Sequence, residues 1–438
     1  MSMKKPIVVF FILLFAASLT VFSSPVNRVS AQGAVRDFSV AARYNFADSG
    51  YNTFYPQTLV VQQGDQVNIT IRNVGTATFQ FNLQGQNSVA VKAGSQNATA
   101  TEPTDTAVPV FTASSPGIFT FSADKFPEMN GELVVLPSNF SSYSPSSQTR
   151  SFTQLVLPDF ASDGYDKFFP GVMVVNQGDT VNVTIRNTDD MSHGFAIAAY
   201  DLNAAVNPGQ DQPNGSIAPF DTAIQPFTAS KAGVFRWFCT TPCGPGHFEM
   251  VGQLVVLPTQ NSPYSPDINT VYSYFAITPD FAGAGYSNCL PDIVFANQND
   301  FVYIEVRNTD TNTYDFSMPG YSVNNVTILA GSSSDPSVTY VPSSSLFADQ
   351  SGVFEFTYSY GSGTASNQMN GYLVVIPTQN AASTSPSPSP SAISPSGFSL
   401  LYAELAIALL IIGVVSGVVV AAIFSRQKQS QTGDKASK

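Results

Sequence analysis

Gln177-Gly-Asp-Thr-Val-Asn-Val-Thr-Ile-Arg-Asn187 is the stretch that best indicates the fold of this chain. A Gln-Gly-Asp turn signal is followed by strict alternation of apolar and polar residues, and this period of two is typical of a β-strand with one buried face. The same pattern runs from Gln63 to Asn73 and, with asparagine in place of glycine, from Gln298 to Asn308. The chain of 438 residues therefore holds three copies of one unit.

Two further signals recur in each copy. A Gly-Tyr pair is followed by a proline six positions after its glycine, and each copy closes with Met-x-Gly and an apolar strand. The period is about 115 to 120 residues, which is the size of a whole domain rather than of a solenoid repeat. Short strands rich in Val, Ile, Phe and Thr, bounded by Gly, Pro, Asn and Asp, predict an antiparallel β-sandwich in each copy.

The predicted fold class is therefore all-β, with three tandem Greek-key β-sandwiches. We expect the modules at residues 36–137, 150–258 and 270–377, joined by flexible linkers that contain serine and proline. A Ser/Pro-rich stalk follows the third module at 378–398, and this composition favours an extended, semi-stiff segment.

The two ends of the chain carry targeting signals. Residues 1–31 contain two lysines, an apolar run and small residues, as in a secretory signal peptide; an uncleaved first membrane helix is the alternative. Residues 399–425 include twenty consecutive uncharged residues, enough for about 30 Å of transmembrane helix. The basic residues of 426–438 favour a cytoplasmic tail. We expect a single-pass membrane protein with the bulk of the chain extracytoplasmic.

The composition narrows the classes of partner. The chain has a formal net charge of −12 and only 11% charged residues, so it lacks the basic patch that nucleic-acid binding needs. An acidic surface favours a basic protein partner at low salt, or serves only to keep the domain soluble. With three cysteines, the chain is not a disulfide-stapled scaffold.

Both histidines of the chain belong to one pattern of potential metal ligands. The pattern is Cys239-x3-Cys243-x3-His247-x2-Met250, and His193 lies upstream, just beyond an Arg-Asn strand end. Thiolate, imidazole and thioether form a soft ligand set that suits copper. A histidine at one strand end and a loop between two later strands can converge at one pole of a sandwich, and the glycines of Gly244-Pro-Gly246 allow the loop to turn its ligands inward.

Several kinds of site can use these donors. Cys239 and Cys243 can form a disulfide outside the cell. A Cys2His2 zinc site would leave Met250 unexplained. A mononuclear blue-copper site of His193, Cys243, His247 and Met250 would leave Cys239 spare. A dinuclear copper centre uses all five side chains.

The second module resembles the cupredoxin domain of cytochrome oxidase subunit II, which holds the dinuclear CuA centre; similar domains occur in nitrous oxide reductase. The matching stretches are Ser192-His-Gly-Phe195 and Cys239-Thr-Thr-Pro-Cys-Gly-Pro-Gly-His-Phe-Glu-Met250. The match covers about 70 residues, and the cupredoxin pattern extends more weakly over the first and third modules. The resemblance implies two copper ions held by two bridging thiolates, two imidazoles, a weak thioether and a backbone carbonyl: Cys239, Cys243, His193, His247, Met250 and Thr241.

The other two modules lack these ligands. Aligned on the Arg-Asn strand end, His193 corresponds to Phe79 and Tyr314. In the third module Tyr358, Ser362 and Ser366 stand where the second has Cys239, Cys243 and His247, and the first module has a shorter loop without cysteine. We expect both modules to be metal-free at this place, and Cys289 to be a buried thiol.

The predicted function is electron transfer. With no third histidine, the chain cannot supply the additional copper sites of multicopper oxidases and copper nitrite reductases, and a hydrolase would have to take a histidine from the copper site. The resemblance implies a CuA carrier that exchanges electrons with a redox protein donor and acceptor and serves as, or replaces, subunit II of a haem-copper oxidase, with oxygen reduction on another subunit. The alternatives are a freestanding shuttle for a nitrogen-oxide or ammonia pathway, and a cell-surface copper-binding or interaction protein.

Overall fold

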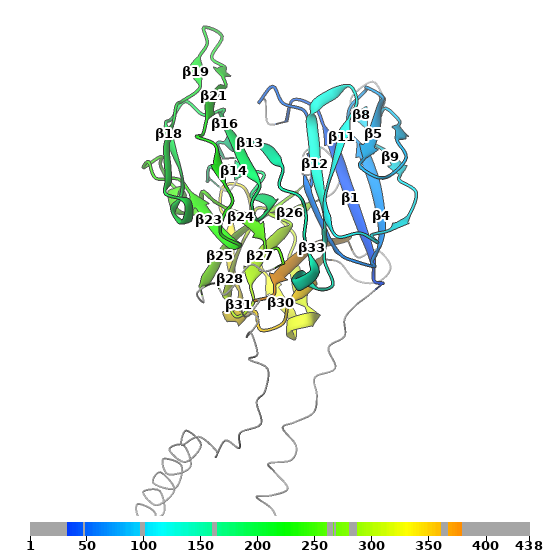
Figure 1. The fold of residues 1–438 in the computed structure, drawn as a ribbon. Coiled ribbons are helices and arrows are strands. Elements are labelled where there is room, and N and C mark those ends of the chain that lie inside the picture. Colours follow the sequence, from blue (N-terminus) through cyan, green and yellow to red (C-terminus); the bar gives the residue numbers. More distant parts are fainter. Residues whose placement is uncertain are drawn as a thin grey trace, which may run out of the picture. The chain divides into compact units, whose positions relative to one another are not determined.

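The computed structural model describes residues 33–378 apart from short segments at 47–48, 97–100, 160–163, 261–265, 267–268, 280–286 and 361–366. All described residues lie in one compact unit. They form strands joined by turns and a few short 3-10 helices, with no α-helix among them (Figure 1).

The first repeat forms two five-stranded sheets. Its elements are β1 Val35–Arg43, β2 Thr53–Tyr55, β3 Thr58–Gln62, β4 Gln66–Asn73, β5 Phe79–Leu83, β6 Val89–Val91, β7 Ser95–Gln96, β8 Thr101–Glu102, β9 Thr104–Ala107, β10 Phe111–Thr112, β11 Gly117–Ala123, β12 Phe126–Leu136 and the 3-10 helix η2 Phe140–Ser142. One sheet has the order β10-β4-β1-β2 with β9 beside β4; the other has the order β3-β12-β11-β5-β6.

The second repeat has the same plan. Its elements are β13 Thr149–Leu157, β14 Lys167–Phe169, β15 Val172–Asn176, β16 Thr180–Asn187, β17 His193–Ile197, η3 Ala198–Tyr200, β18 Leu202–Val206, β19 Gln210–Asp211, β20 Ile217–Ala218, β21 Phe220–Ala223, β22 Phe227–Thr228, β23 Gly233–Phe238, η4 His247–Glu249 and β24 Val251–Leu257. The sheets run β14-β13-β16-β21, with β22 also on β16, and β15-β24-β23-β17-β18. The pair β19–β20 lies in a hairpin that projects from the body in Figure 1.

The third repeat closes the unit. Its elements are β25 Thr270–Thr278, β26 Asn288–Leu290, β27 Ile293–Asn297, β28 Phe301–Asn308, β29 Tyr314–Met318, η6 Pro319–Tyr321, β30 Val323–Ile328, β31 Ser337–Phe347, β32 Gly352–Tyr360 and β33 Asn367–Ile376. The sheets run β26-β25-β28-β31 and β27-β33-β32-β29-β30. The recurrent proline of each repeat follows a cis peptide bond.

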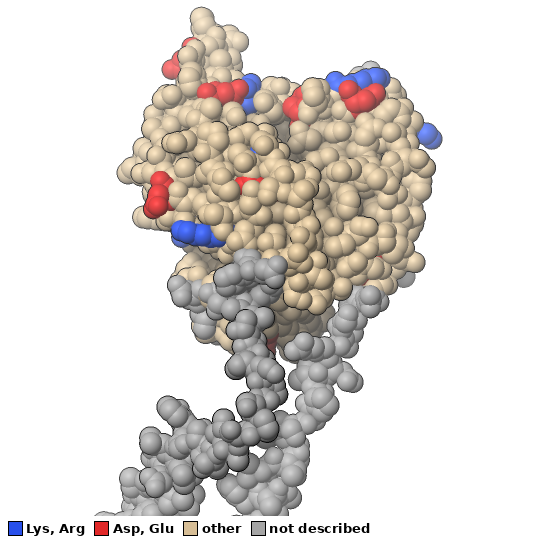
Figure 2. All heavy atoms as spheres, viewed as in Figure 1, with Lys and Arg blue, Asp and Glu red and all other residues tan. Residues whose placement is uncertain are grey.

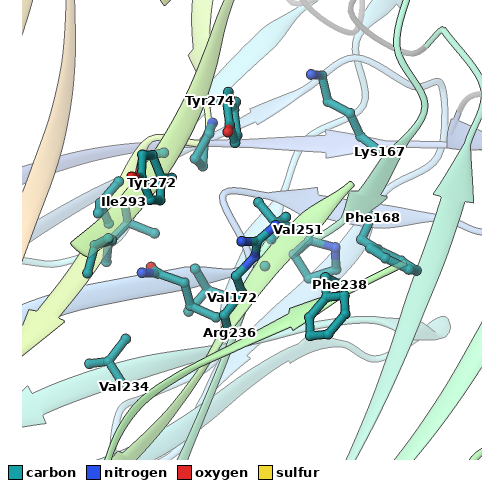
Figure 3. A pocket seen from close by; sticks show the side chains of 18 of the residues that line it. Lys167, Phe168, Val172, Val234, Arg236, Phe238, Val251, Tyr272, Tyr274 and Ile293 are labelled. Atoms are coloured by element: carbon teal, nitrogen blue, oxygen red, sulfur yellow. The ribbon is translucent and has the colours of Figure 1, made fainter. Parts of the chain in front are cut away.

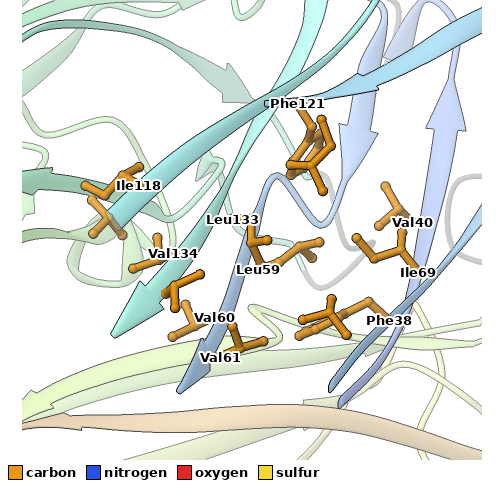
Figure 4. Close-up of a cluster of buried hydrophobic side chains, with 14 of the residues drawn as sticks. Phe38, Val40, Leu59, Val60, Val61, Ile69, Ile118, Phe121, Leu133 and Val134 are labelled. Atoms are coloured by element: carbon orange, nitrogen blue, oxygen red, sulfur yellow. The ribbon is translucent and has the colours of Figure 1, made fainter. Parts of the chain in front are cut away.

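The alternating strand of each repeat has the burial that its sequence predicts. In β4, β16 and β28 the apolar residues are buried and those between them are more exposed. Figure 4 shows the result in the first repeat, where side chains of β1, β3 and β4 meet those of β11 and β12. The pairing is not purely antiparallel, because β1–β4 and β3–β12 run parallel, as do their counterparts in the other repeats.

A second core joins the three repeats. Every residue of β15 and of β27 is buried. In β15, Met173 and Val175 face the core of their own repeat, whereas Val172 and Val174 belong to a cluster that also contains Val134 of the first repeat and Val374 of the third. Strands covered on both faces read as continuous apolar runs, which explains the unbroken apolar sequence from Val172 to Val175 in β15.

The all-β prediction is confirmed for the described residues, but the predicted arrangement as three tandem sandwiches is wrong. The described residues are not three tandem sandwiches on flexible joints: six principal sheets, two from each repeat, are packed into one compact unit around a shared core. Removing the second apolar face from water favours close packing over free linkers.

The single-pass membrane localisation also requires correction. In the part of the chain that the structure describes, no helix is long and apolar enough to cross a membrane. The segments predicted as a signal peptide (1–31), a transmembrane helix (399–425) and a cytoplasmic tail (426–438) lie outside the described residues, as does the stalk beyond residue 378.

The face of the molecule in Figure 2 carries scattered acidic and basic side chains on a largely uncharged surface.

Candidate metal centre

His193 is placed by the asparagine that ends strand β16. The Asn187 side-chain amide donates hydrogen bonds to the backbone carbonyls of Met191 (2.8 Å) and Asn207 (2.9 Å), and its oxygen accepts the amide of Asp189 (2.9 Å). These bonds hold the turn that leads into His193, the first residue of β17. Asn73 and Asn308 make equivalent bonds in the other repeats, so the asparagine of each Arg-Asn pair clamps the turn that follows it, a role that the sequence pattern alone does not indicate.

The other predicted ligands lie on the loop between β23 and β24. The Cys239 amide donates to the Met250 carbonyl at 3.1 Å, which closes the loop at its base. Gly244 (φ +110°) and Gly246 (φ +77°) have left-handed backbone conformations that glycine adopts without strain. The Gly246 carbonyl accepts the amides of Glu249 (2.9 Å) and Met250 (3.2 Å). The turn that begins at Gly246 thus carries His247 and Met250 toward the cysteines.

The loop and β17 bring all six predicted donors together. Two donors bound to one tetrahedral ion at about 2.0–2.3 Å lie about 3.3 to 3.8 Å apart, and the separations here range from 3.2 to 4.0 Å. They are Cys239 Sγ to Cys243 Sγ, 3.7 Å; Cys239 Sγ to His193 Nδ1, 4.0 Å; Cys239 Sγ to Thr241 O, 3.2 Å; Cys243 Sγ to His247 Nδ1, 3.4 Å; and Cys243 Sγ to Met250 Sδ, 3.5 Å. The donor set therefore fits soft metal ions.

The centre is closed inside and open at one edge. His193 and Met250 are fully buried, and Cys239 and Cys243 are 3% and 2% exposed. His247 is only half-buried, and the neighbouring Phe248 is 76% exposed. Both cysteines are free thiols, so the structure does not contain the disulfide that the sequence left open.

Trp237 lies beneath the centre. Its side chain is fully buried in the core cluster that also holds Cys239, Cys243 and Met250. It packs on Gly252 of the next strand, where an added Cβ would lie 2.2 Å from the indole ring. Trp237 is thus a core residue that forms the apolar floor of the site.

His193 is held by a carboxylate. Its Nε2 lies 2.9 Å from Asp189 Oδ2, while its Nδ1 faces Cys239. A second carboxylate, Asp166, joins Asp189 and His193 in a group whose ligand atoms all lie within 4.8 Å of one another. A carboxylate on the far nitrogen fixes the tautomer and the orientation of a metal-binding imidazole. Asp166 directly precedes β14, in a part of the sequence distant from His193.

The environment separates the pKa values of the two cysteines. Burial opposes ionisation of Cys239, but hydrogen bonds from His193 and from the Gly194 amide (3.3 Å) outweigh it and lower the pKa of the thiol to about 6. Burial, together with the charge of Cys239, raises the pKa of the Cys243 thiol to about 12. Burial lowers the pKa of His193, but the hydrogen bonds with Asp189 and Cys239 outweigh burial and raise this pKa to about 9. Without metal, the site thus favours a thiolate–imidazolium pair of Cys239 and His193.

The corresponding places in the other repeats hold aromatic side chains. In the third repeat, Tyr314 and Tyr358 are fully buried, and Tyr314 hydrogen-bonds Asp310 as His193 does Asp189. Cys289 is 3% exposed and contacts the Tyr358 hydroxyl, in agreement with the expected buried thiol. In the first repeat, buried Phe79 occupies the equivalent position. A hydrogen bond between an aspartate and the first residue of the next strand is therefore common to two repeats. The sulfur and imidazole donors are particular to the second repeat.

A cavity of about 420 Å³ lies behind the metal loop, where residues of all three repeats meet. Phe238, Glu249 and Val251 of the loop and its flanking strands line one side, and Tyr272 and Tyr274 of β25 line another. Figure 3 shows Arg236 extending into this space, where its guanidinium lies 3.3 Å from the Phe248 carbonyl. The cavity thus adjoins the backbone that carries the ligands.

The comparisons with known proteins give short, specific similarities. No family model matches the chain. It is 38% identical to the nitrous-oxide reductase of Ralstonia nicotianae over 85 residues, and 36% identical to that of Stutzerimonas stutzeri over 87. Each match covers 19% of this chain but only 12% of the relative, so the chain shares a small part of the length of these reductases.

The comparison with solved structures found copper proteins at low similarity. They include the Cu-containing nitrite reductase of Thermus scotoductus (13% identity, TM-score 0.20, covering 78% of this chain and 99% of that one) and the copper nitrite reductase of Nitrosomonas europaea (13%, 0.22, 51% and 94%). At such TM-scores these likenesses carry no argument. The resemblance to cytochrome oxidase subunit II stays a prediction, and what the comparisons show is a chain related over one segment to nitrous-oxide reductases.

Proposed function

We propose that the second repeat holds a dinuclear copper centre of the CuA type and that the protein transfers single electrons between redox partners. The observation that carries this proposal is a pair of buried thiols 3.7 Å apart, each with an imidazole Nδ1 directed at it. The proposed ligands are Cys239, Cys243, His193, His247, Met250 and the carbonyl of Thr241.

The contacts favour two metal ions over one. A tetrahedral zinc ion takes four ligands, whereas six donors converge here. A mononuclear blue-copper site would leave Cys239 without a role. Yet Cys239 is as buried as Cys243. Its sulfur accepts a hydrogen bond from the Gly194 amide, and Nδ1 of His193 faces it. A thiol surrounded in this way is better explained as a ligand than as a spare residue.

When bound, a copper pair would supply reversible one-electron oxidation and reduction. The chain's own residues would orient the ligands and exclude water. Asp189 holds His193 in place, and the apolar core around Trp237 seals the inner side. Among the proposed side-chain ligands only His247 is not fully enclosed, so we expect electrons to leave toward a docked protein through it.

The identity of the partner is the finer part of the proposal. We propose that the acceptor is a respiratory enzyme, either a haem-copper oxidase or a reductase of a nitrogen oxide. The 36–38% identity to nitrous-oxide reductases favours the second of these. Co-purification tests the choice, because an oxidase would bring haem absorbance with it and a nitrogen-oxide reductase would bring activity on its own substrate.

Replacement of Cys239 by serine tests the centre, with Cys289→Ser as the matched control. Cys289 is equally buried but lies in the third repeat. We expect the copper-loaded Cys239 variant to bind fewer than two coppers and to lose the electron paramagnetic resonance signal of an electron shared between two coppers. The Cys289 variant should keep both coppers and this signal. An unchanged signal in the Cys239 variant would contradict the bridging role.

A further inference from the structure

Two recurrent motifs of the sequence meet where the repeats touch. The Arg186 guanidinium of the second repeat lies 4.7 Å from the ring centroid of Tyr51 in the first, and its Nε donates to the Ser49 carbonyl at 2.8 Å. The Arg307 guanidinium of the third repeat lies 3.8 Å from the ring centroid of Tyr165 in the second and hydrogen-bonds its hydroxyl. In both contacts the arginine of an Arg-Asn pair stacks on the tyrosine of the Gly-Tyr pair in the preceding repeat.

At the second of these contacts the tyrosine also covers the metal loop. A Cβ added to Gly246 would lie 2.4 Å from Cγ of Tyr165, so the ring lies directly against the Gly246 backbone. The Gly246 carbonyl in turn accepts the amides of Glu249 and Met250. One side of the tyrosine therefore supports the turn that carries His247 and Met250, while its ring and hydroxyl bind the arginine.

The arginine is itself held by the third repeat. Arg307 is partly buried and forms an ion pair with Glu305 on the same strand, at 3.3 Å. Partial removal from water strengthens both the stacking of a guanidinium on an aromatic ring and its ion pair. The structure thus gives a continuous line of contacts from Glu305 through Arg307 and Tyr165 to Gly246.

We propose that Arg307 and Tyr165 are positioning residues for the metal loop, so that the third repeat, although it lacks the ligands, sets the place of His247 and Met250. This inference rests on the proposed function, which makes the loop a metal-binding loop. The contact of Tyr165 with Gly246 itself is present without metal. The Arg186–Tyr51 stack has the same chemistry and lies in the other interface, which makes it a matched control.

The test measures hydrogen exchange in the metal-free full chain. Exchange of the Glu249 and Met250 amides reports the stability of the turn on Gly246. We expect Arg307→Gln to accelerate it about tenfold, equivalent to about 1.4 kcal/mol, and Arg186→Gln to leave it unchanged. Equal exchange in the Arg307 variant and the native chain, or equal acceleration in both variants, would overturn the proposal.

A second pair of variants covers the event that Arg307→Gln fails to fold. Tyr165→Phe keeps the ring on Gly246 and loses only the hydroxyl, so its exchange should rise less than that of Tyr165→Ala. Copper-loaded Tyr165→Ala should also release copper to a chelator about tenfold faster than Tyr165→Phe. Identical behaviour of the two variants would refute the positioning role. Failure of the native chain to bind copper would refute the proposed function alone, because the exchange result does not depend on metal.

Discussion

Truncation of Asp189 to alanine should weaken metal binding about 10- to 100-fold. The carboxylate oxygen lies 2.9 Å from Nε2 of His193, whose side chain is fully buried. Truncation leaves that N–H donor without its partner, at a cost of about 1–3 kcal/mol for an unsatisfied buried group. Loss of a carboxylate behind a metal-binding histidine typically reduces affinity by about 10- to 100-fold, or about 1.4–2.7 kcal/mol. The first cost falls on folding stability, and the second sets the expected loss of metal affinity.

The fold should survive this change, because the backbone bonds of Asp189 remain. Its amide donates to the Asn187 side chain and its carbonyl accepts the Gly209 amide at 2.7 Å. The assay is competition for copper with a chelator of known affinity at neutral pH. Asp190→Ala is the control, since the adjacent carboxylate is exposed. Native affinity in the Asp189 variant, or an equal loss in the Asp190 variant, would refute the orienting role.

Two further predictions concern stability. Asp179→Asn should destabilise the protein by about 3–5 kcal/mol, because Asp179 accepts Arg150 Nε at 2.7 Å in a buried ion pair. Asp300→Asn should cost only about 1–3 kcal/mol, because Val271 replaces that arginine; equal shifts in urea midpoint would count against this difference. Burial raises the pKa of Asp292 to about 7, so the folded chain binds more protons than the unfolded chain between about pH 4 and 7, and this group's stabilisation is lost as pH rises through that window. Asp292→Asn should remove that part of the loss between about pH 4 and 7; an unchanged pH dependence of the midpoint would contradict it.

The sequence predicted what depends on local pattern. Alternation in the strand before Asn187 places it correctly as a half-buried strand of β-structure. The spacing from Cys239 to Met250 requires only a short loop with two glycines, and the structure brings those donors together with His193. Local chemistry was sufficient here because strand ends and turns limit where the side chains can go.

Features that depend on distant packing could not be predicted. The uniform burial of β15 was visible as an apolar run, but the run does not say which repeat covers its second face. The Gly-Tyr and Arg-Asn motifs were recognised as repeats, whereas the stacking of Arg307 on Tyr165 joins residues 142 positions apart. Asp166 likewise approaches His193 only through the fold. Such contacts depend on how whole sheets pack, which no local pattern determines.

Electron paramagnetic resonance of the copper-loaded chain, with a copper count on the same sample, tests the central claim most directly. Partly reduced protein should contain two coppers per chain and show the hyperfine pattern of one unpaired electron shared equally between two copper nuclei. A pattern from a single copper nucleus at one copper per chain would contradict the dinuclear centre and favour a mononuclear site built from the same loop.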